Sequence, residues 1–435
     1  MLRRGLLATF ALSLTGFSPA PVAAQDAADI RIAGLAGQST TLRAFDALRR
    51  VREAGLEDMV VLNEIPAPPF GESERAAALA SRLESTGLEV RVDAVGNVLA
   101  RQRGRTGART IAVIAHIDTV FPAETDVTVS REANVYTAPG IGDNARGLAM
   151  MLSLARAFRL SGIETNDDVL YIGSVGEEGL GDLRGVRHLF SGAADAPDID
   201  TVVAIDGGPL ERVVATAVGS NRYRVTFRGP GGHSYGDFGR ANPHHALADA
   251  ISRFRRAAQQ VSDARGEKAT FSVGRIGGGT SINSIAFESW MEVDMRSTDP
   301  ERLAALDAAF REAMNLALLA ENGRRREGAA LELELDPVGA RPAGRTPLDA
   351  SLVVNAMAAL RAVGVVPAIT SSSTDANIPM ALGIPAITIS RGGVSRNAHA
   401  LNETWQDDGT MRAEQAALLL LLAEAGVAPA SVAAD

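Results

Sequence analysis

Acidic residues and histidines follow several short apolar runs of this sequence, and their spacing suits metal chemistry. Residues 111–115 read I-A-V-I-A, which is typical of a buried strand, and His116 and Asp118 come directly after them. Residues two apart on an extended chain project to the same face, so the imidazole and the carboxylate should lie side by side. Because a ligand histidine usually donates its second N–H to a carboxylate, Asp118 is a candidate to orient a metal-binding His116. For this tripeptide alone, a structural hydrogen bond is the better interpretation.

Two further apolar runs also end in acids. Residues 168–175 lead into Glu177 and Glu178, and residues 201–205 lead into Asp206. Adjacent side chains on an extended chain point in different directions, so one glutamate can face a cation while the other faces a substrate. A solvated acidic turn would explain any one of these sites, but not the repetition. The carboxyl ends of neighbouring strands are where open α/β sheets place their sites.

A glycine-dense turn contributes one more acid. Residues 138–147 read A-P-G-I-G-D-N-A-R-G and precede a segment with helical patterning. A phosphate-binding loop is disfavoured because the turn lacks a lysine and Asp143 would repel phosphate. The glycines instead permit a tight backbone that can aim Asp143 toward His116.

Together these residues predict a centre for two divalent cations. The nitrogen and oxygen donors are His116, Asp143, Glu178, Asp206 and His399. With Asp143 bridging, one ion could take His116 and Asp206, and the other could take Glu178 and His399. Three carboxylates and one bridging hydroxide would balance the charge of two such ions, which would lie about 3.5–4 Å apart.

The chemistry expected of this centre is hydrolysis. Zinc accepts the mixture of ligands, with cobalt or manganese as alternatives, and the absence of cysteine restricts the ligands to nitrogen and oxygen. A hydrolytic reaction needs a base, and Glu177 lies beside a ligand while facing another way. It is therefore placed to accept the proton of the attacking water and to deliver it to the leaving nitrogen.

Length and composition set the frame for these residues. A chain of 435 residues suggests two domains, and 46 % hydrophobic with 22 % charged residues is typical of a globular protein. A formal net charge of -9 argues against a nucleic-acid partner. Lys268 is the only lysine, which nearly excludes lysine chemistry.

The order of the predicted elements divides the chain. Strands and helices alternate in residues 40–218 and again in 337–428, which predicts an α/β catalytic domain in two parts around a mixed sheet. Residues 219–336 follow the order β-α-β-β-α-β, which predicts an inserted ferredoxin-like α+β domain that could act as a lid and in dimerisation. Between the leader and about residue 41, the Ala- and Asp-rich composition suggests a linker.

Residues 1–24 have the form of a secretory signal peptide. Arg3 and Arg4 are followed by a short apolar segment and by the small residues Val22-Ala23-Ala24. The apolar run is too short to span a bilayer, so no membrane anchor is expected after cleavage. The mature protein is therefore expected to be periplasmic or secreted, with twin-arginine export as an alternative route.

The motifs together resemble a known family. H-I-D-T-V, G-I-G-D-N, the Glu177-Glu178 pair, G-G-H-S, S-T-D-A-N and His399 near the end are similar to the co-catalytic zinc family of tripeptide aminopeptidase (peptidase T), glutamate carboxypeptidase, succinyl-diaminopimelate desuccinylase and aminoacylase. The sequences P-G-I-G-D-N and S-T-D-A-N are most similar to those of the peptidase T-like members. The resemblance implies a zinc-exopeptidase fold and the same metal ligands. It also implies Glu177 as general base, Asp118 as the residue that orients His116, and a cis peptide bond after Asp143.

The same resemblance assigns three residues of the insert. His233 in G-G-H-S would polarise the scissile carbonyl across a dimer interface, so a homodimer is expected. Asn283 in G-G-T-S-I-N would bond the substrate carbonyl or carboxylate. Arg296 in V-D-M-R would bind the substrate carboxylate with parallel hydrogen bonds.

These assignments predict an exopeptidase-type hydrolase of small peptides or N-acyl amino acids. One alternative is a serine hydrolase, because Ser234 lies in a G-x-S-x-G sequence and Asp375 and His399 follow in the order of α/β-hydrolases. A nucleophile elbow, however, needs a strand directly before the serine and a helix directly after it. A second alternative is an inactive peptide-binding protein on the same fold, which the complete set of ligands and base disfavours.

Overall fold

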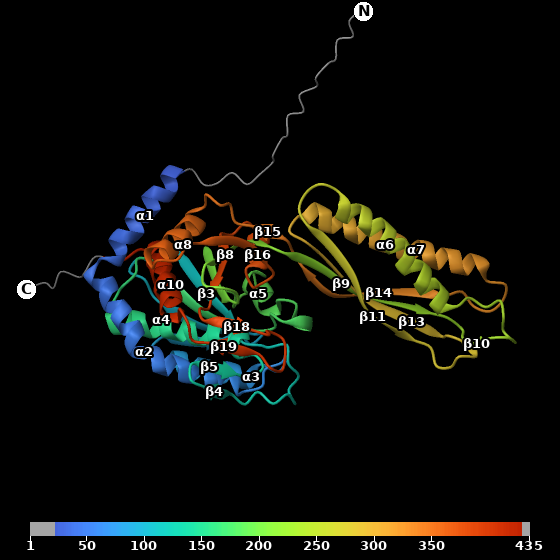
Figure 1. Cartoon of the computed structure of the whole chain (residues 1–435), viewed down its shortest axis with the longest axis horizontal. Coiled ribbons are helices and arrows are strands. Elements are labelled where there is room, and N and C mark those ends of the chain that lie inside the picture. Colours follow the sequence, from blue (N-terminus) through green and yellow to red (C-terminus); the bar gives the residue numbers. More distant parts are fainter. Residues whose placement is uncertain (1–21, 429–435) are drawn as a thin grey trace, which may run out of the picture.

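The computed structural model describes residues 22–428, which form a larger and a smaller body joined side by side (Figure 1). Most of the predicted signal peptide therefore lies outside the described residues. None of the helices between residues 22 and 428 is long and apolar enough to cross a membrane.

The larger body is built on a mixed nine-stranded sheet. Four neighbouring parallel strands, β6, β3, β7 and β17, form its middle, and antiparallel pairs occur toward both ends. The strands in sheet order are β1 (Glu89–Val92), β2 (Val98–Gln102), β6 (Asp168–Ser174), β3 (Thr110–His116), β7 (Thr201–Asp206), β17 (Ala386–Ser390), β8 (Arg212–Ala217) and β15 (Gly344–Arg345), with β16 (Ala368–Ser372) also paired to β8.

Helices cover both faces of this sheet, which is why the central strands read as unbroken apolar runs. In β3, Ile111 and Val113 pack into one core, and Ala112 and Ile114 pack into another on the opposite face. The first core is closed by α1 (Val22–Ala36), α2 (Ser39–Asn63), α3 (Ser73–Ser85), α4 (Gly147–Ser161), α8 (Ser351–Ala362) and α10 (Thr410–Ala425). The second is closed by α5 (Arg184–Leu189) and α9 (Asn377–Ala381).

Helix α1 corrects the expectation of a linker after the leader. Its Ala28 and Ile32 are buried in the first core, and Asp29 forms an ion pair with Arg361 at 2.7 Å. The composition was misleading because the buried residues Ala28, Ile32 and Leu35 stand among several other alanines, so the apolar positions of the helix give only a weak pattern. This part of the chain belongs to the body that carries β3.

The smaller body has the element order expected for residues 219–336. Its antiparallel sheet runs β11 (Ala269–Gly278), β13 (Glu288–Ser297), β9 (Gly219–Arg228) and β14 (Glu332–Arg341), and α6 (Pro243–Asp263) and α7 (Pro300–Arg324) pack on one face. Strand β13 alternates buried and partly exposed residues, because only one of its faces meets the helices. The other face of the sheet carries charged side chains.

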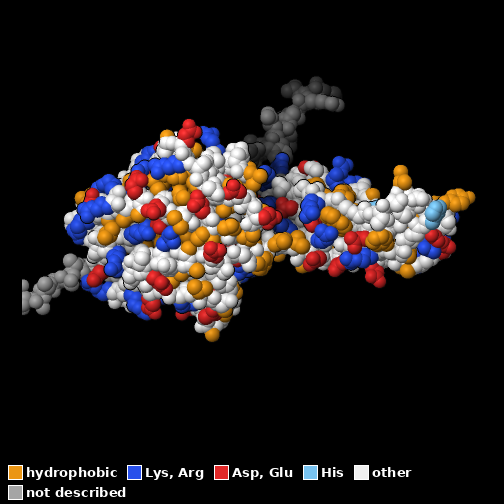
Figure 2. All heavy atoms as spheres, turned by 90° about the horizontal axis from the view of Figure 1, so that it is seen from below, with side chains coloured by type: hydrophobic (Ala, Val, Ile, Leu, Met, Phe, Trp, Pro, Cys, Tyr) orange, Lys and Arg blue, Asp and Glu red, His pale blue; other side chains and the backbone are white. Residues whose placement is uncertain are grey.

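The end of the smaller body far from the main sheet is partly apolar. Two-residue strands β10 (Gly232–His233) and β12 (Ser284–Ile285) pair there, as Figure 1 shows for β10. Hydrophobic side chains project at this end (Figure 2), and Tyr235, Phe238 and Ile282 are 89 %, 75 % and 104 % exposed.

A small sheet that the sequence did not predict lies beside the main one. It comprises β18 (Val394–Arg396), β19 (Thr404–Gln406), β5 (Val135–Thr137) and β4 (Ser130–Glu132). Trp405 of β19 is fully buried against Tyr136 of β5. The sheet thereby fixes the two ends of the loop that contains His399.

Candidate metal centre

The ends of three adjacent strands position most of the predicted ligands. His116 and Asp206 are the last residues of β3 and β7, and Glu177 and Glu178 follow β6. These strands are neighbours in the sheet and run parallel, so their carboxyl ends meet at one edge. The five predicted ligands fall into two groups whose donor atoms lie within 4.8 Å of one another: His116, Asp143, Asp206 and Asp143, Glu178, His399.

Asp143 belongs to both groups, and each of its carboxylate oxygens faces one of them. Oδ1 lies 3.3 Å from Nε2 of His116, and Oδ2 lies 3.4 Å from Nε2 of His399. His399 Nε2 is also 3.1 Å from Oε1 of Glu178. The peptide bond between Asp143 and Asn144 is cis, as the resemblance implied. A carboxylate with its oxygens directed at two histidines has the arrangement needed to bridge two cations.

Asp118 supports the centre in a way that differs in detail from the expectation. Its buried carboxylate accepts the backbone N–H groups of Glu177 (2.9 Å) and Glu178 (2.8 Å). His116 Nδ1 lies 3.0 Å from the Asp118 carbonyl oxygen and 3.7 Å from the carboxylate. The carbonyl is thus the nearer acceptor for the His116 ring, which leaves Nε2 free to face Asp143. The Asp118 carboxylate chiefly fixes the two glutamates.

The titration of these groups reflects their mutual attraction. Burial opposes the charged imidazole of His116, yet its hydrogen bonds to Asp118 and Asp143 raise its pKa well above the ordinary value. Hydrogen bonds to Asp143 and Glu178 raise the pKa of His399 to about 10. The pKa of Asp143 is held well below its usual range despite burial, by Arg391 and by both histidines. Without metal, the site is a network of imidazolium and carboxylate groups.

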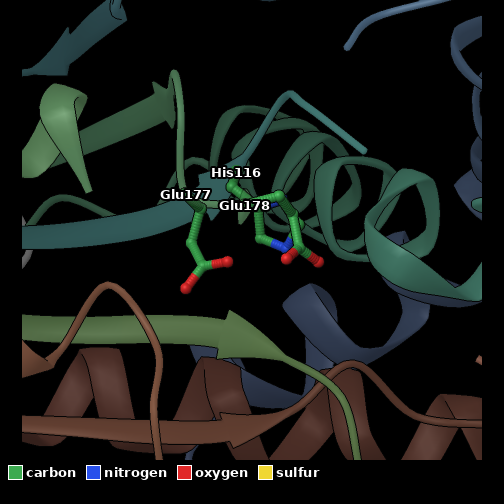
Figure 3. Close-up of side chains that lie close together, drawn as sticks. All are labelled: His116, Glu177 and Glu178. Atoms are coloured by element: carbon green, nitrogen blue, oxygen red, sulfur yellow. The ribbon is translucent and has the colours of Figure 1, made fainter. Parts of the chain in front are cut away.

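Glu177 is buried, and a carboxylate oxygen of Glu177 forms a third group with donor atoms of His116 and Glu178, all within 4.8 Å of one another (Figure 3). Its Oε1 accepts a hydrogen bond from Nη1 of Arg341 at 2.8 Å, and Nη2 of Arg341 donates to the Glu177 carbonyl. Burial raises the pKa of the Glu177 carboxyl well above its ordinary value, although Arg341 pulls it down. A carboxylate with a raised pKa accepts a proton more readily than an exposed one does. Sequence reasoning did not find Arg341.

A second arginine, also missed from the sequence, contacts two predicted ligands. Nη1 of Arg391 lies 3.2 Å from Oδ1 of Asp143 and 3.2 Å from Oδ1 of Asp206. The side chain is 3 % exposed. A Cβ at Gly142 or Gly207 would lie 3.1–3.3 Å from the guanidinium group. Glycines beside each of the two aspartates therefore make room for this cation.

Glu403 holds the segment that carries Asp143. Its buried carboxylate accepts the backbone N–H groups of Gly140, Gly142 and Asp143, each at 3.0 Å. Three donated hydrogen bonds fix the backbone that directs the Asp143 carboxylate. Its position four residues after His399 is the only indication that the sequence offers.

The three residues predicted in the insert lie in two different places. Arg296 lines the same cavity as Asp143, Glu178 and His399, which has a volume of about 1430 Å³. His233 and Asn283 lie at the far end of the smaller body, where the Ser234 N–H donates to the Asn283 carbonyl at 2.9 Å. One chain thus brings Arg296, but not His233 or Asn283, to the metal centre.

The geometry contradicts the serine-hydrolase alternative. Ser234 is exposed in a turn after β10, whereas Asp375 is buried in the larger body and accepts from Ser174 at 2.6 Å. His399 contacts Glu178 and Asp143 instead. These side chains form no nucleophilic triad.

Comparison with known proteins agrees with this architecture. Residues 112–423 match the model of peptidase family M20/M25/M40, so the chain belongs to this family of metallopeptidases and amidohydrolases. The uncharacterized protein YqjE of Bacillus subtilis is 25 % identical over 275 residues, which cover 59 % of this chain and 71 % of that protein.

Solved structures share the fold over most of their length. Aminopeptidase PepT from Bacillus cereus superposes with a TM-score of 0.69 at 20 % identity, covering 85 % of this chain and 98 % of that one. The di-peptidase Dug1p from Saccharomyces cerevisiae gives a TM-score of 0.67 at 15 % identity, covering 89 % and 100 %. The predicted fold class is confirmed.

Proposed function

We propose that the protein is a two-metal hydrolase that cleaves the amide bond of small peptides or N-acyl amino acids, acting as an exopeptidase. The observation that carries the proposal is the Asp143 carboxylate, whose two oxygens each face a separate group of donors. His116 and Asp206 would complete one metal position, and Glu178 and His399 the other. Zinc is the expected metal, with cobalt or manganese as alternatives.

The donor set fits such ions in number and type. Each position offers one imidazole and two carboxylate oxygens, which leaves coordination open for water and substrate. Bound there, two divalent ions would lower the pKa of a shared water and polarise the carbonyl of the substrate.

Glu177 is the proposed proton acceptor. Only Oε1 is engaged by Arg341, so Oε2 remains to take a proton from the attacking water. The same carboxyl group can then protonate the leaving nitrogen, because its raised pKa makes both directions of transfer accessible.

The insert is proposed to bind substrate and a second copy of the chain. Arg296 reaches the cavity and would pair with a substrate carboxylate. His233 would act in the partner's cavity, which is supported by its position among the exposed apolar side chains at the far end of the insert. An active, stable monomer would contradict this role of His233.

The signal-like leader supports a further proposal, that the mature protein works in the periplasm or outside the cell. Reporter-enzyme fusion to residues 1–24, followed by cell fractionation, tests it directly. A reporter retained in the cytoplasm would contradict it.

The central experiment combines metal analysis with a panel of free and blocked dipeptides and tripeptides. We expect about two ions per chain, amide hydrolysis that a chelator abolishes, and no inhibition by a serine-directed phosphonate. Glu177→Ala should keep both ions and lose turnover by several orders of magnitude. Two ions with no hydrolysis of any substrate would favour the inactive binding protein, and full activity of Glu177→Ala would exclude Glu177 as the base.

A further inference from the structure

The charged face of the smaller sheet carries two successive groups in which one carboxylate lies between two arginines. We call them the near group (Arg222, Asp294, Arg296) and the far group (Arg224, Glu292, Arg275). Their central acids are two residues apart on β13, so they project from the same face. The near group lines the cavity of the proposed metal centre, and the far group does not.

The two groups differ in which guanidinium nitrogens they use. In the near group, both arginines donate from Nε: Arg222 to Oδ1 of Asp294 at 3.0 Å, and Arg296 to Oδ2 at 2.7 Å. Within residues 22–428, neither guanidinium makes a further hydrogen bond from its terminal nitrogens. Those nitrogens therefore remain available to a ligand in the cavity.

In the far group one terminal nitrogen of each arginine, Nη1, already binds the central carboxylate. Nη1 of Arg224 donates to Glu292 at 2.8 Å, and Nη1 of Arg275 donates to the same carboxylate at 3.0 Å. Trp290 lies against both guanidinium groups, with its ring centre 4.0 Å from Cζ of Arg224 and 5.5 Å from Cζ of Arg275. The arginines of the near group thus keep all their terminal nitrogens free, whereas each arginine of the far group uses one of them on the central carboxylate.

The near group carries a net positive charge within the cavity. Asp294 neutralises one of its two arginines and holds both in place, which limits the ordering that an incoming anion must impose. The two arginines nearest the metal ligands, Arg341 and Arg391, are occupied by Glu177 and by the aspartates. Two more arginines line the cavity: Arg212 donates to the carbonyl oxygen of Gly207, and Arg412 lies in the first turn of α10. Arg222 and Arg296 differ from them as a pair, because one carboxylate holds both guanidinium groups and leaves their terminal nitrogens to meet an anionic substrate.

We propose that the near group binds two carboxylates of one substrate residue. Arg296 takes the terminal carboxylate, and Arg222 takes the carboxylate of an acidic side chain. The preferred substrates are then peptides with a C-terminal aspartate or glutamate, or N-acyl derivatives of these amino acids. This inference rests on the proposed function, because it names the substrate class of the same site.

Substrate pairs that differ by one charge test the inference. We would measure kcat/KM of the zinc-loaded protein for Ala-Glu against Ala-Gln, and for N-acetyl-glutamate against N-acetyl-glutamine. The acid should be preferred about 10- to 100-fold in whichever pair is hydrolysed, as expected for a charge-assisted hydrogen bond. Equal rates for acid and amide would overturn the substrate class while leaving the hydrolase intact.

Matched variants assign the preference to one side chain. Arg222→Met should lower kcat/KM for the acid substrate more than for the amide and so remove the acid preference, and Arg222→Lys should restore part of the preference by restoring the charge. Arg224→Met is the control, because it removes an arginine from the same face outside the cavity, and it should keep the full preference. An unchanged preference in Arg222→Met, or an equal loss in Arg224→Met, would overturn the role of Arg222.

A binding measurement separates this inference from the proposed function. Zinc-loaded Glu177→Ala would be titrated with N-acetyl-glutamate and N-acetyl-glutamine by calorimetry. Tighter binding of the acid, lost in the Glu177→Ala, Arg222→Met double variant, supports the anion site even if the parent protein hydrolyses nothing. Equal affinity for the two compounds, or no binding of either, overturns it.

Discussion

The two groups of ligands that meet at Asp143 have equal donors and unequal surroundings. In the group with His116 and Asp206, the histidine is 2 % exposed, and Arg391 contacts both of its aspartates. In the group with Glu178 and His399, the histidine is 52 % exposed, and within residues 22–428 Glu178 has no ion pair with an arginine. One proposed metal position therefore contains a fixed positive charge beside its ligands, and the other does not.

This difference bears on the order in which the positions fill. A guanidinium group that contacts two carboxylates weakens the pull of those carboxylates on a second cation, by about 1–4 kcal/mol between the dielectric of bulk water and that of a protein surface. The Glu178–His399 position should bind its ion first and more tightly. Arg391 in turn compensates the aspartates when the metal is absent, so the empty centre stays folded.

The largest expected effect comes from removing Asp143, the proposed ligand that the two metal positions share. Asp143→Ala should lower zinc content well below two ions per chain and reduce kcat/KM by several orders of magnitude, because both positions lose a ligand. Metal analysis after dialysis and steady-state rates would check this. Asp206→Ala, as the matched variant, should lose only the ion at the His116 position. Full occupancy of both positions in Asp143→Ala would remove the bridge from the proposal.

Acidification should weaken metal binding strongly. In the metal-free protein the pKa of His399 is raised to about 10, so the proton must leave before the nitrogen can bind an ion. Between pH 6 and 8 the affinity at this position should rise about tenfold per pH unit, with release of about one proton per ion. Titration calorimetry in buffers of different ionisation enthalpy measures both quantities. A pH-independent affinity would contradict His399 as a ligand.

The stability of the metal-free protein changes with pH in the opposite direction to the metal affinity. Because the folded-state pKa of His399 lies above its unfolded value, the stabilisation from its carboxylate partners is complete below about pH 6.5. It is lost as the pH rises through about 10.

Arg391→Met tests the comparison between the positions directly. Affinity at the His116 position should rise about tenfold, since a competing charge is removed, and affinity at the Glu178 position should change little. The melting temperature of the metal-free variant should fall, because two aspartates that are only 16 % and 17 % exposed lose their arginine partner. A variant that merely damaged the fold would lose both stability and metal affinity.

Arg212→Met is the appropriate control for that substitution. Arg212 lines the same cavity, but its Nη1 donates to the carbonyl oxygen of Gly207 at 2.7 Å rather than to a carboxylate. Its removal should shift metal affinity less than the removal of Arg391. Equal shifts in the two variants would mean that only the overall charge of the cavity matters.

The smallest effect is expected from Glu403→Gln. The amide keeps one acceptor oxygen for the three backbone N–H groups, so the free energy of unfolding should fall by about 1–3 kcal/mol and metal affinity only several-fold. Denaturant titration of the metal-free protein measures the first quantity. Glu332→Gln, at an exposed position on β14, should be neutral. An unchanged stability of Glu403→Gln would show that the segment holds Asp143 unaided.

The sequence predicted those parts of the molecule that repeat a simple pattern. The apolar runs before His116, Glu177 and Asp206 are recognisable because a strand buried on both faces has no polar interruption. The convergence of these ends follows from parallel pairing. The order β-α-β-β-α-β was also readable, since its strands alternate. The roles of the individual site residues remain predictions.

What could not be read from the sequence depends on packing between distant segments. Arg341 and Arg391 are ordinary arginines until the fold buries them against Glu177 and Asp143. Arg391 directly follows β17, and this place at the end of a buried strand, which it shares with the acidic ligands, is its one signal in the sequence. Helix α1 was missed because alanine gives a weak pattern.

The position of Arg341 connects the proposed base to the junction between the two bodies. It is the last residue of β14, where the smaller body returns to the larger one, and its guanidinium group contacts Glu177 across that junction. Any hinge rotation that displaces β14 would pull the guanidinium group from Glu177 and raise the pKa of its carboxyl further. Such a rotation would therefore change the basicity of Glu177.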